Sequence, residues 1–369
     1  MNKGLNILIC PLEWGLGHAT RMIPVVRKLQ DMNNHVIIAS GEEHLSLFRN
    51  EISGLSYVLF PGFKPGYSRF LPQYLFLLFK IPSLLYHIVN EHFRLNRIIA
   101  EYSVDVVISD NRFGLWNKKI TSVYITHMPR IPFPGFFKFL EPLGILLHRQ
   151  IIKKYSLCFI PDLPGDLNLS GRLSHNIRLP ENTRFIGILS RFTETGKSTD
   201  EISSKFQHNT IILSGPEPQR EILKQKLVIL LKDKEPITVM FEGKPGNRGE
   251  IARNENIIFY SHLPAYRMKG IIASSDSILT RAGYTTLMEL VSLNCTALII
   301  PTPGQTEQEY LAEYLSEKGW FYTLSQDEIK AGMSIRKEKA FCHGELNRQS
   351  SILLTEALKD LLEKNHKES

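Results

Sequence analysis

Apolar residues in this chain gather in short β-branched runs that alternate with stretches of helical periodicity. The first series of runs opens with LNILIC at 5–10, passes through DVVISD at 105–110 and ends with SLCFIP at 156–161. Strands that alternate with helices are typical of parallel sheets. The pattern therefore predicts an α/β fold in which helices cover both faces of a parallel sheet.

A second series of the same kind runs from TIILSGP at 210–216 to TALIIPTP at 296–303. The segment between the two series is rich in Pro, Gly, Ser and polar residues, as connections between domains are. We therefore expect two Rossmann-like domains. The predicted parts are an N-terminal domain over 1–165, a linker over 166–207, a C-terminal domain over 208–345, and a final amphipathic helix within 346–369 that belongs to either domain and is a candidate to pack back on the first.

Charge narrows the class of partner. The chain has 369 residues, which suits two domains, and its net charge of +7 favours an anionic partner. Nucleic acid, a phosphorylated small molecule and an acidic membrane surface all fit, but dispersed basic residues without a recognised module argue against nucleic acid. The apolar run from Leu5 to Leu12 ends at Glu13 without a cleavage site, which predicts a protein of the cytoplasm.

The stretch WGLGHATR at 14–21 predicts the first functional group. Gly15 and Gly17 permit a tight turn, and His18 then falls near the first turn of a helix, at the sheet edge where ligands gather. Asp110 ends another buried-type strand at the same edge. It can hold the imidazole in one tautomer and stabilise its protonated form, as a general base requires. The structural alternatives are a polar helix-terminal residue for His18 and a helix cap for Asp110.

The stretch RAGYTTLMEL at 281–290 predicts a phosphate site. A strand ends at Thr280, a small-residue turn follows at Ala282 and Gly283, and a helix begins at Tyr284. The first turn of that helix exposes N–H groups and hydroxyls, which bind phosphate. Glu289, on the same helix, can reach a ribose hydroxyl, and its structural alternative is a solvent-facing charge.

Other candidates lie at the same predicted edge. Ser214 and Gly215 follow a strand, and the loop with Leu263 can present backbone groups to a base. Glu307 and Gln308 begin a helix and can bond sugar hydroxyls. Each residue is unremarkable alone, so their common edge is what indicates a site.

These motifs resemble those of the GT-B glycosyltransferases, two-domain enzymes that use nucleotide sugars. The resemblance is greatest to the branch with the N-acetylglucosaminyltransferase of lipid II synthesis and the monogalactosyldiacylglycerol synthases. GLGH resembles the glycine-histidine loop of that branch, RAGYTTLMEL its donor-phosphate motif, and PTPGQTEQEYLAEYL its sugar-contacting loop. The chain departs from the branch in EWGLGH, which is less glycine-rich, and at Glu309, where the lipid II enzyme has a second glutamine. These departures leave the sugar open.

The resemblance implies a role for each candidate. His18, in the acceptor loop with Gly15 and Gly17, corresponds to the base, and Asp110 stands where related plant and macrolide glycosyltransferases have the supporting aspartate. The implied donor residues are Ser214, Arg281, Gly283 and Thr285 for the diphosphate, with Gly215, Ala282 and Tyr284 beside them, Leu263 for uracil, Glu289 for ribose, and Glu307 and Gln308 for the transferred sugar. The implied donor is a UDP-sugar, with no cofactor.

The implied reaction is an inverting, metal-independent transfer of a hexose or N-acetylhexosamine. The chain has no Asp-x-Asp motif, and its four cysteines have no metal-ligand spacing. We expect Arg281 and the helix N-terminus near Tyr284 to stabilise the leaving nucleoside diphosphate. His18 would take a proton from an acceptor hydroxyl that attacks the anomeric carbon from the opposite face.

Two stretches rich in Leu, aromatic and basic residues favour a lipid-linked acceptor, although another hydroxyl acceptor is also compatible. They span 65–97, with Arg69, Lys80, Arg94 and Arg97, and 128–150. Lys80 and two prolines interrupt the first, so we expect an interfacial surface on anionic lipid rather than a spanning helix. This would make the protein peripheral on the inner face of the plasma membrane. Helices that simply cover the sheet are the alternative.

Two other functions stay open. One is a nucleotide-sugar 2-epimerase of the same fold, and the other is a non-catalytic nucleotide-sugar-binding protein.

Overall fold

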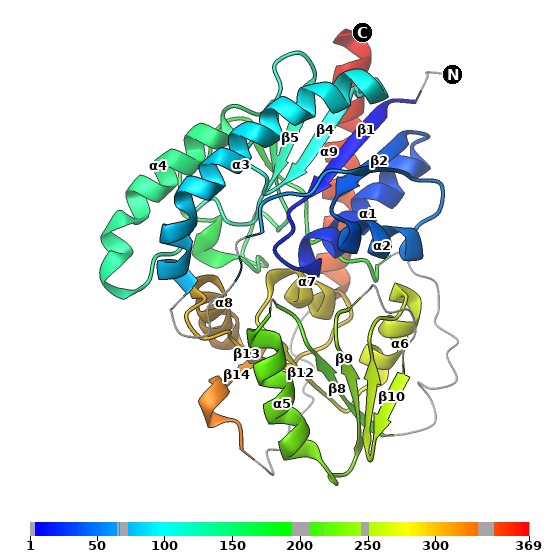
Figure 1. Ribbon diagram of the computed structural model, residues 1–369, viewed down its shortest axis with the longest axis vertical. Helices are drawn as coiled ribbons and strands as arrows, with labels where there is room; N and C mark the ends of the chain where they lie inside the picture. The colour runs from blue at the N-terminus through cyan, green and yellow to red at the C-terminus, as the bar shows by residue number, and fades with distance from the viewer. Residues whose placement is uncertain are drawn as a thin grey trace.

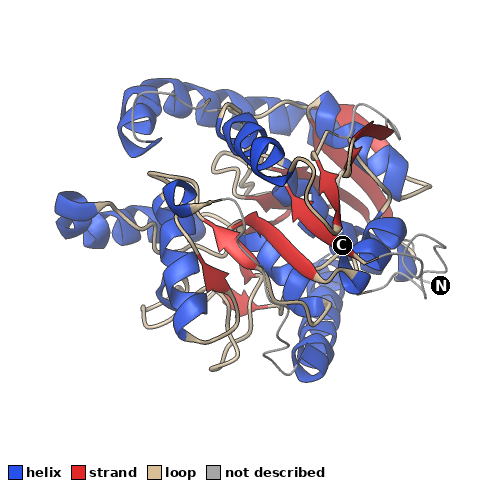
Figure 2. Cartoon of the chain, turned by 90° about the horizontal axis from the view of Figure 1, so that it is seen from below, coloured by secondary structure: helices blue, strands red, loops and turns tan. Residues whose placement is uncertain are grey.

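The computed structural model has two α/β domains, one above the other in Figure 1. The structure describes residues 4–64, 66, 73–193, 207–215, 217–244, 251–330 and 343–368. Each domain is built on a seven-stranded sheet with helices around its strands (Figure 2). The predicted pair of Rossmann-like domains is confirmed.

The first sheet is parallel throughout and has the strand order β3-β2-β1-β4-β5-β6-β7. Its strands are β1 (Asn6–Pro11), β2 (His35–Ser40), β3 (Ser56–Leu59), β4 (Val106–Asp110), β5 (Thr121–Ile125), β6 (Leu157–Ile160) and β7 (Thr183–Phe185). The central strands are buried along almost their whole length, since helices cover both faces.

The second sheet has the order β10-β11-β9-β8-β12-β13-β14, and β10 is antiparallel to its neighbour. Its strands are β8 (His208–Ile212), β9 (Ile237–Phe241), β10 (Ile251–Asn254), β11 (Ile257–Tyr260), β12 (Ser277–Arg281), β13 (Leu298–Ile300) and β14 (Tyr322–Thr323). The remaining pairs are parallel.

Helices connect most of the strands. In the first domain they are α1 (Leu16–Asp31), α2 (Glu42–Glu51), α3 (Gln73–Tyr102), α4 (Glu141–Ile152) and the short 3-10 helices η1 (Gly135–Leu140) and η2 (Gly171–Leu173). In the second domain they are α5 (Gln219–Leu231), α6 (Ala265–Ser274), α7 (Tyr284–Ser292), α8 (Thr306–Glu317) and η3 (Gln326–Glu328), and the chain ends with α9 (His343–Glu368). None of the described helices has an apolar stretch long enough to cross a bilayer.

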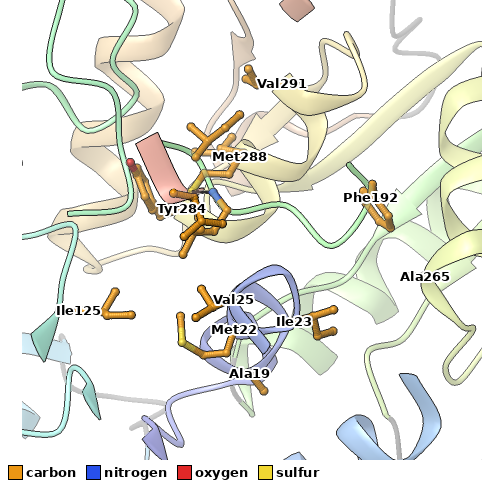
Figure 3. Close-up of a cluster of buried hydrophobic side chains, with 14 of the residues drawn as sticks. Ala19, Met22, Ile23, Val25, Ile125, Phe192, Ala265, Tyr284, Met288 and Val291 are labelled. Atoms are coloured by element: carbon orange, nitrogen blue, oxygen red, sulfur yellow. Dashed lines mark hydrogen bonds between the residues drawn. The ribbon is translucent and has the colours of Figure 1, made fainter. Parts of the chain in front are cut away.

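One hydrophobic cluster crosses the boundary between the domains. Met22 and Val25 of α1 belong to this cluster together with Met288 and Val291 of α7, and Met288 is on the side of α7 toward α1 (Figure 3). All four side chains are buried. Apolar contact between α1 and α7 brings together the first turns of both helices. It therefore fixes the distance between the predicted acceptor loop at His18 and the predicted phosphate site at the start of α7.

The segments predicted as linker and final helix both contact the first domain. Strand β7 lies in the predicted linker and pairs with β6, while residues 194–206 of that segment lie outside the described residues. Helix α9 contacts both domains: Ser350 Oγ accepts a hydrogen bond from Ile188 N at 3.0 Å, and Asn347 Nδ2 donates to Ser292 O at 2.8 Å.

Candidate active site

A cavity of about 780 Å³ lies between the carboxyl edges of the two sheets. Strand order reverses between β1 and β4 in the first sheet and between β8 and β12 in the second. Ligands bind at such switch points in open α/β sheets. The predicted site residues that line the cavity are Gly15, Gly17, His18, Ser214, Gly215, Leu263, Gly283, Tyr284, Thr285, Glu289, Glu307 and Gln308.

His18 and Asp110 form a hydrogen-bonded pair at the first switch point. His18 is in the first turn of α1, Asp110 is the last residue of β4, and His18 Nδ1 lies 3.0 Å from Asp110 Oδ2. Asp110 is fully buried behind the imidazole, whereas the His18 side chain lines the cavity. His18 Nε2 makes no hydrogen bond to the described residues, so this nitrogen is available to a ligand.

Burial and the charge of Arg21 together keep the imidazole neutral, while the charge of Arg21 keeps the carboxylate ionised. Burial raises the pKa of Asp110, but Arg21 and His18 outweigh it and lower the pKa to about 2. Burial lowers the pKa of His18, and Arg21 lowers it further against the opposing effect of Asp110. A neutral imidazole with a free nitrogen is the form that a general base needs.

Arg21 is a site residue that the sequence analysis did not identify. Its Nε donates to Asp110 Oδ2 at 2.8 Å, and its Nη2 donates to Asp110 Oδ1. It follows His18 by three residues on α1, so both side chains lie on the same helix face. That spacing, visible in GLGHATR, is the signal that could have found it.

A second histidine joins the two domains. His127 follows β5 and its Nε2 lies 2.8 Å from Oε1 of Glu307, at the start of α8. The His127 ring stacks on Tyr284 of α7, with ring centroids 4.1 Å apart and an interplanar angle of 11°. Burial raises the pKa of Glu307, but His127 outweighs it, with His18 and Arg21 contributing, so the pKa falls below its ordinary value. The predicted sugar-binding carboxylate is therefore held ionised by the opposite domain.

The turn before α7 has the geometry of an anion site. Gly283 precedes the helix, and Thr285 is in its first turn. Across the turn, the buried Ser214 Oγ has no hydrogen-bond partner among the described residues. A Cβ added to Gly283 would lie 3.7 Å from that hydroxyl. An unpartnered hydroxyl beside a helix N-terminus suits a phosphate oxygen.

Arg281 and Ala282 are not at the cavity wall. The Arg281 guanidinium donates to the carbonyls of Gln219 at 3.0 Å and Pro301 at 3.2 Å, and to the side chain of Gln326 at 2.7 Å. Burial lowers its pKa to about 10. The structure therefore corrects the expectation that Arg281 faces the diphosphate, because neighbouring side chains of a strand point to opposite faces and that of Arg281 runs toward the start of α5. Ala282 is fully buried.

Glu289, the predicted ribose ligand, is buried at the cavity wall and pairs with Arg191. Arg191 Nε lies 2.8 Å from Glu289 Oε1. Burial raises the pKa of Glu289, and Arg191 opposes this. Arg191 comes from the predicted linker, where no periodic pattern precedes it, so nothing in the sequence signalled this contact.

Leu263 and Gln308 also lie at the wall. Leu263 comes immediately before Pro264, the residue that precedes α6, and is almost fully buried. Gln308 Oε1 accepts a hydrogen bond from Thr302 N at 2.9 Å, which fixes the loop between β13 and α8.

Comparison with solved structures identifies the architecture. The chain superposes on the glycosyltransferase of kitacinnamycin with a TM-score of 0.66 at 14% identity, covering 99% of this chain and 100% of that one. For the glycosyltransferase SnogD from Streptomyces nogalater the TM-score is 0.62 at 13% identity, over 98% and 100%. The fold is GT-B. Of the two domains of this GT-B fold, the first contains His18 and the second contains the turn before α7.

Sequence relatives agree with the GT-B fold. The glycosyltransferase family 28 C-terminal domain matches residues 214–363. An uncharacterized glycosyltransferase of Methanosarcina mazei is 25% identical over 244 residues, 62% of each chain, so this chain spans just under two thirds of that relative. The UDP-N-acetylglucosamine--N-acetylmuramyl-(pentapeptide) pyrophosphoryl-undecaprenol N-acetylglucosamine transferase of Thermoanaerobacter sp. is 28% identical over 125 residues, 32% of this chain and 33% of that protein. These matches support a glycosyltransferase and confirm the resemblance stated from the motifs.

Proposed function

We propose that this protein transfers a hexose or N-acetylhexosamine from a UDP-sugar to a hydroxyl of a lipid-linked acceptor, with inversion and without a metal. One observation carries the proposal. His18, which is paired with the buried Asp110, and the turn before α7, with the unpartnered hydroxyl of Ser214, line the same cavity from opposite domains.

In this reaction His18 Nε2 removes the proton from the acceptor hydroxyl, whose oxygen attacks the anomeric carbon. The bond to the nucleoside diphosphate breaks on the opposite side of the sugar, and the diphosphate takes the bonding electrons. Asp110 stabilises the imidazolium that forms. The N-terminus of α7 and the unpartnered hydroxyl of Ser214 stabilise the leaving diphosphate, since oriented N–H groups there favour negative charge.

Two relatives support a nucleoside diphosphate sugar as donor. The Thermoanaerobacter relative is named for UDP-N-acetylglucosamine, and the spinosyn rhamnosyltransferase SpnG has been solved with thymidine diphosphate, at a TM-score of 0.58 and 13% identity over 98% of this chain and 96% of that one. Glu289 would accept hydrogen bonds from the ribose and the backbone of Leu263 would contact uracil. The ion pair with Arg191 holds the Glu289 carboxylate at the cavity wall, where it could accept a hydrogen bond from the ribose.

The proposal of a lipid-linked acceptor is supported by the apolar side chains on one side of the cavity. The residues there from the first domain include Ile81, Leu84, Ile88, Phe113, Ile131 and Phe133. Helices α3 and α4 both extend to the left in Figure 1. Their outward side chains include Phe79, which is 77% exposed, Tyr86, Phe93, Leu143 and Leu147. Apolar side chains this exposed, with the basic residues Lys80, Arg94 and Arg149 on the same helices, suit an anionic membrane surface. Arg69, which the sequence analysis included, lies outside the described residues.

The test is a donor screen followed by a transfer assay. Thermal shift with UDP, dTDP and GDP sugars should single out one UDP-sugar, and a lipid extract should then receive the labelled sugar with the opposite anomeric configuration, read by NMR. Epimerised nucleotide sugar in the absence of acceptor would favour the epimerase instead. Binding without turnover for every acceptor would favour a nucleotide-sugar-binding protein.

A further inference from the structure

Arg21 contacts three side chains of the site at once. Besides its two bonds to Asp110, its Nη2 lies 2.9 Å from His18 Nδ1 and its Nη1 lies 3.2 Å from His127 Nδ1. Only 1% of this large side chain is exposed. A guanidinium placed so deeply, beside the rings of both His18 and His127, does more than neutralise one carboxylate.

The contact with His127 fixes the tautomer of that ring. A guanidinium has only donors, so His127 Nδ1 must accept the hydrogen bond from Arg21. The proton of the neutral ring is therefore on Nε2, where it is donated to Glu307 Oε1 at 2.8 Å. If His127 carried its proton on Nδ1, the Nε2 lone pair would face the Glu307 carboxylate and repel it. Arg21 therefore orients the sugar-side carboxylate through His127.

The contact with His18 acts on the proposed base. The guanidinium neutralises Asp110 and puts a positive charge beside Nδ1, which opposes protonation of the ring. Several other groups act on His18: Asp110 from β4 favours the charged imidazole, His127 after β5 opposes it, His44 of α2 interacts with it, and Glu307 of α8 is an anion within its field. Of these, Arg21 is the charged group that opposes protonation most strongly.

We propose that Arg21 is a positioning residue that connects the His18–Asp110 pair to the His127–Glu307 pair, so that one guanidinium sets both the acceptor base and the sugar-binding carboxylate. The inference rests on the proposed function for the roles of His18 and Glu307. The chain of contacts runs from His18 through Asp110, Arg21 and His127 to Glu307, from one domain to the other.

The test is a histidine titration by NMR of the full-length protein, with the wild type compared with Arg21→Met. Loss of the guanidinium should raise the pKa of His18 by about one unit or more, since a neighbouring charge shifts a pKa by about 1 to 3 units. A base must be unprotonated, so the acid limb of kcat/KM should move to higher pH by the same amount. The KM for the nucleotide sugar should rise while UDP affinity stays unchanged, because His127 no longer has a fixed tautomer toward Glu307.

Arg112→Met is the matched control. Arg112 is also a buried arginine, donates to Glu91 Oε1 at 3.0 Å and makes no contact with His18. The Arg112→Met substitution should lower the stability of the protein without changing the pKa of His18. If Arg21→Met does not fold, Arg21→Gln removes the same charge and keeps a donor toward Asp110, and the same shifts are expected.

An unmoved His18 pKa or an unchanged nucleotide-sugar KM in the folded Arg21 variant would overturn the inference, as would an equal His18 shift in Arg112→Met. The titration requires no turnover. The titration can therefore contradict the inference about Arg21 even if sugar transfer is observed. Conversely, absence of transfer with every donor would contradict the proposed function and leave the titration result unchanged.

Discussion

The hydroxyl of Thr285 donates a hydrogen bond to the backbone carbonyl of Gly17, at 3.1 Å, across the boundary between the domains. Gly17 is in the first turn of α1 and Thr285 is in the first turn of α7, so the predicted acceptor loop and the predicted phosphate site are in direct contact. A Cβ on Gly17 would lie 3.1 Å from Thr285 Oγ1, closer than most such contacts. The absence of a side chain at position 17 thus sets how closely the walls of the cavity approach.

Gly17→Ala should therefore slow sugar transfer. The added methyl group pushes Thr285 and α7 away from α1, and a small displacement of reacting groups costs about 10- to 100-fold in rate. UDP affinity should fall much less than the rate, because the proposed nucleotide contacts are mainly to the second domain. Gly165→Ala is the control, since a Cβ there meets nothing within 4 Å. Transfer rates equal to wild type in Gly17→Ala would show that this approach is not needed.

His18→Ala should reduce transfer by about 10² to 10⁴, which is the usual contribution of general acid-base catalysis. Donor binding should stay nearly intact. Asp110→Asn should also slow transfer, because it removes the charge that stabilises imidazolium. Since the two residues act as one unit, the losses should not add in a double-mutant cycle measured with UDP affinity beside it. Full activity in His18→Ala would end the assignment of this histidine as the base.

Glu289→Ala should weaken UDP binding by about 1.5 to 3 kcal/mol, the range for hydrogen bonds to charged groups. The change also leaves Arg191 without its carboxylate, so circular dichroism must show that the fold is kept. Glu289→Gln retains an acceptor for the ribose and should lose less affinity. Unchanged UDP affinity by calorimetry in folded Glu289→Ala would contradict the placement of ribose at this residue.

Liposome sedimentation should show binding that requires anionic lipid and weakens with salt, because surface attraction is screened beyond about 10 Å at 0.1 M. Leu143→Ser with Leu147→Ser, both exposed on α4, should reduce binding. Ile229→Ser is the matched control, since Ile229 is 76% exposed on α5 of the other domain. Equal binding to neutral and anionic vesicles, or equal loss in the control, would argue against the α3 and α4 surface.

The fold and the pairing of His18 with Asp110 could both be predicted from the sequence, because the strand order of a parallel sheet places the two residues at the same edge. The runs that end near His18 and at Asp110 are β1 and β4, which are adjacent at the switch point of the first sheet. Residues at the carboxyl ends of neighbouring parallel strands must lie close together. Asp110 could therefore be paired with His18 across 92 positions of the sequence.

Side-chain direction could not be predicted in the same way. Arg281 ends β12 at the expected edge, yet its guanidinium donates to the backbone carbonyls of Gln219 and Pro301 and does not face the cavity. Arg21 was within a recognised motif, but its partners come from β4 and the loop after β5, which no local pattern joins to α1. Strand β7 has only three residues, too few for a hydrophobic period to appear.

Helix α9 changes how the chain can be divided. Ser350 bonds to Ile188, and Lys364 and Asn365 lie with Leu5 around one small hollow at the far end of the first sheet, so the chain returns to the domain from which it started. In covalent terms the second domain is an insertion within the first. A single cut after Phe192 would yield a first fragment that lacks the buried side chains of Ala357, Leu358 and Leu361. Strand β1 begins and helix α9 ends at the same end of the molecule (Figure 1), so a circular permutation could place each domain in one continuous stretch of chain.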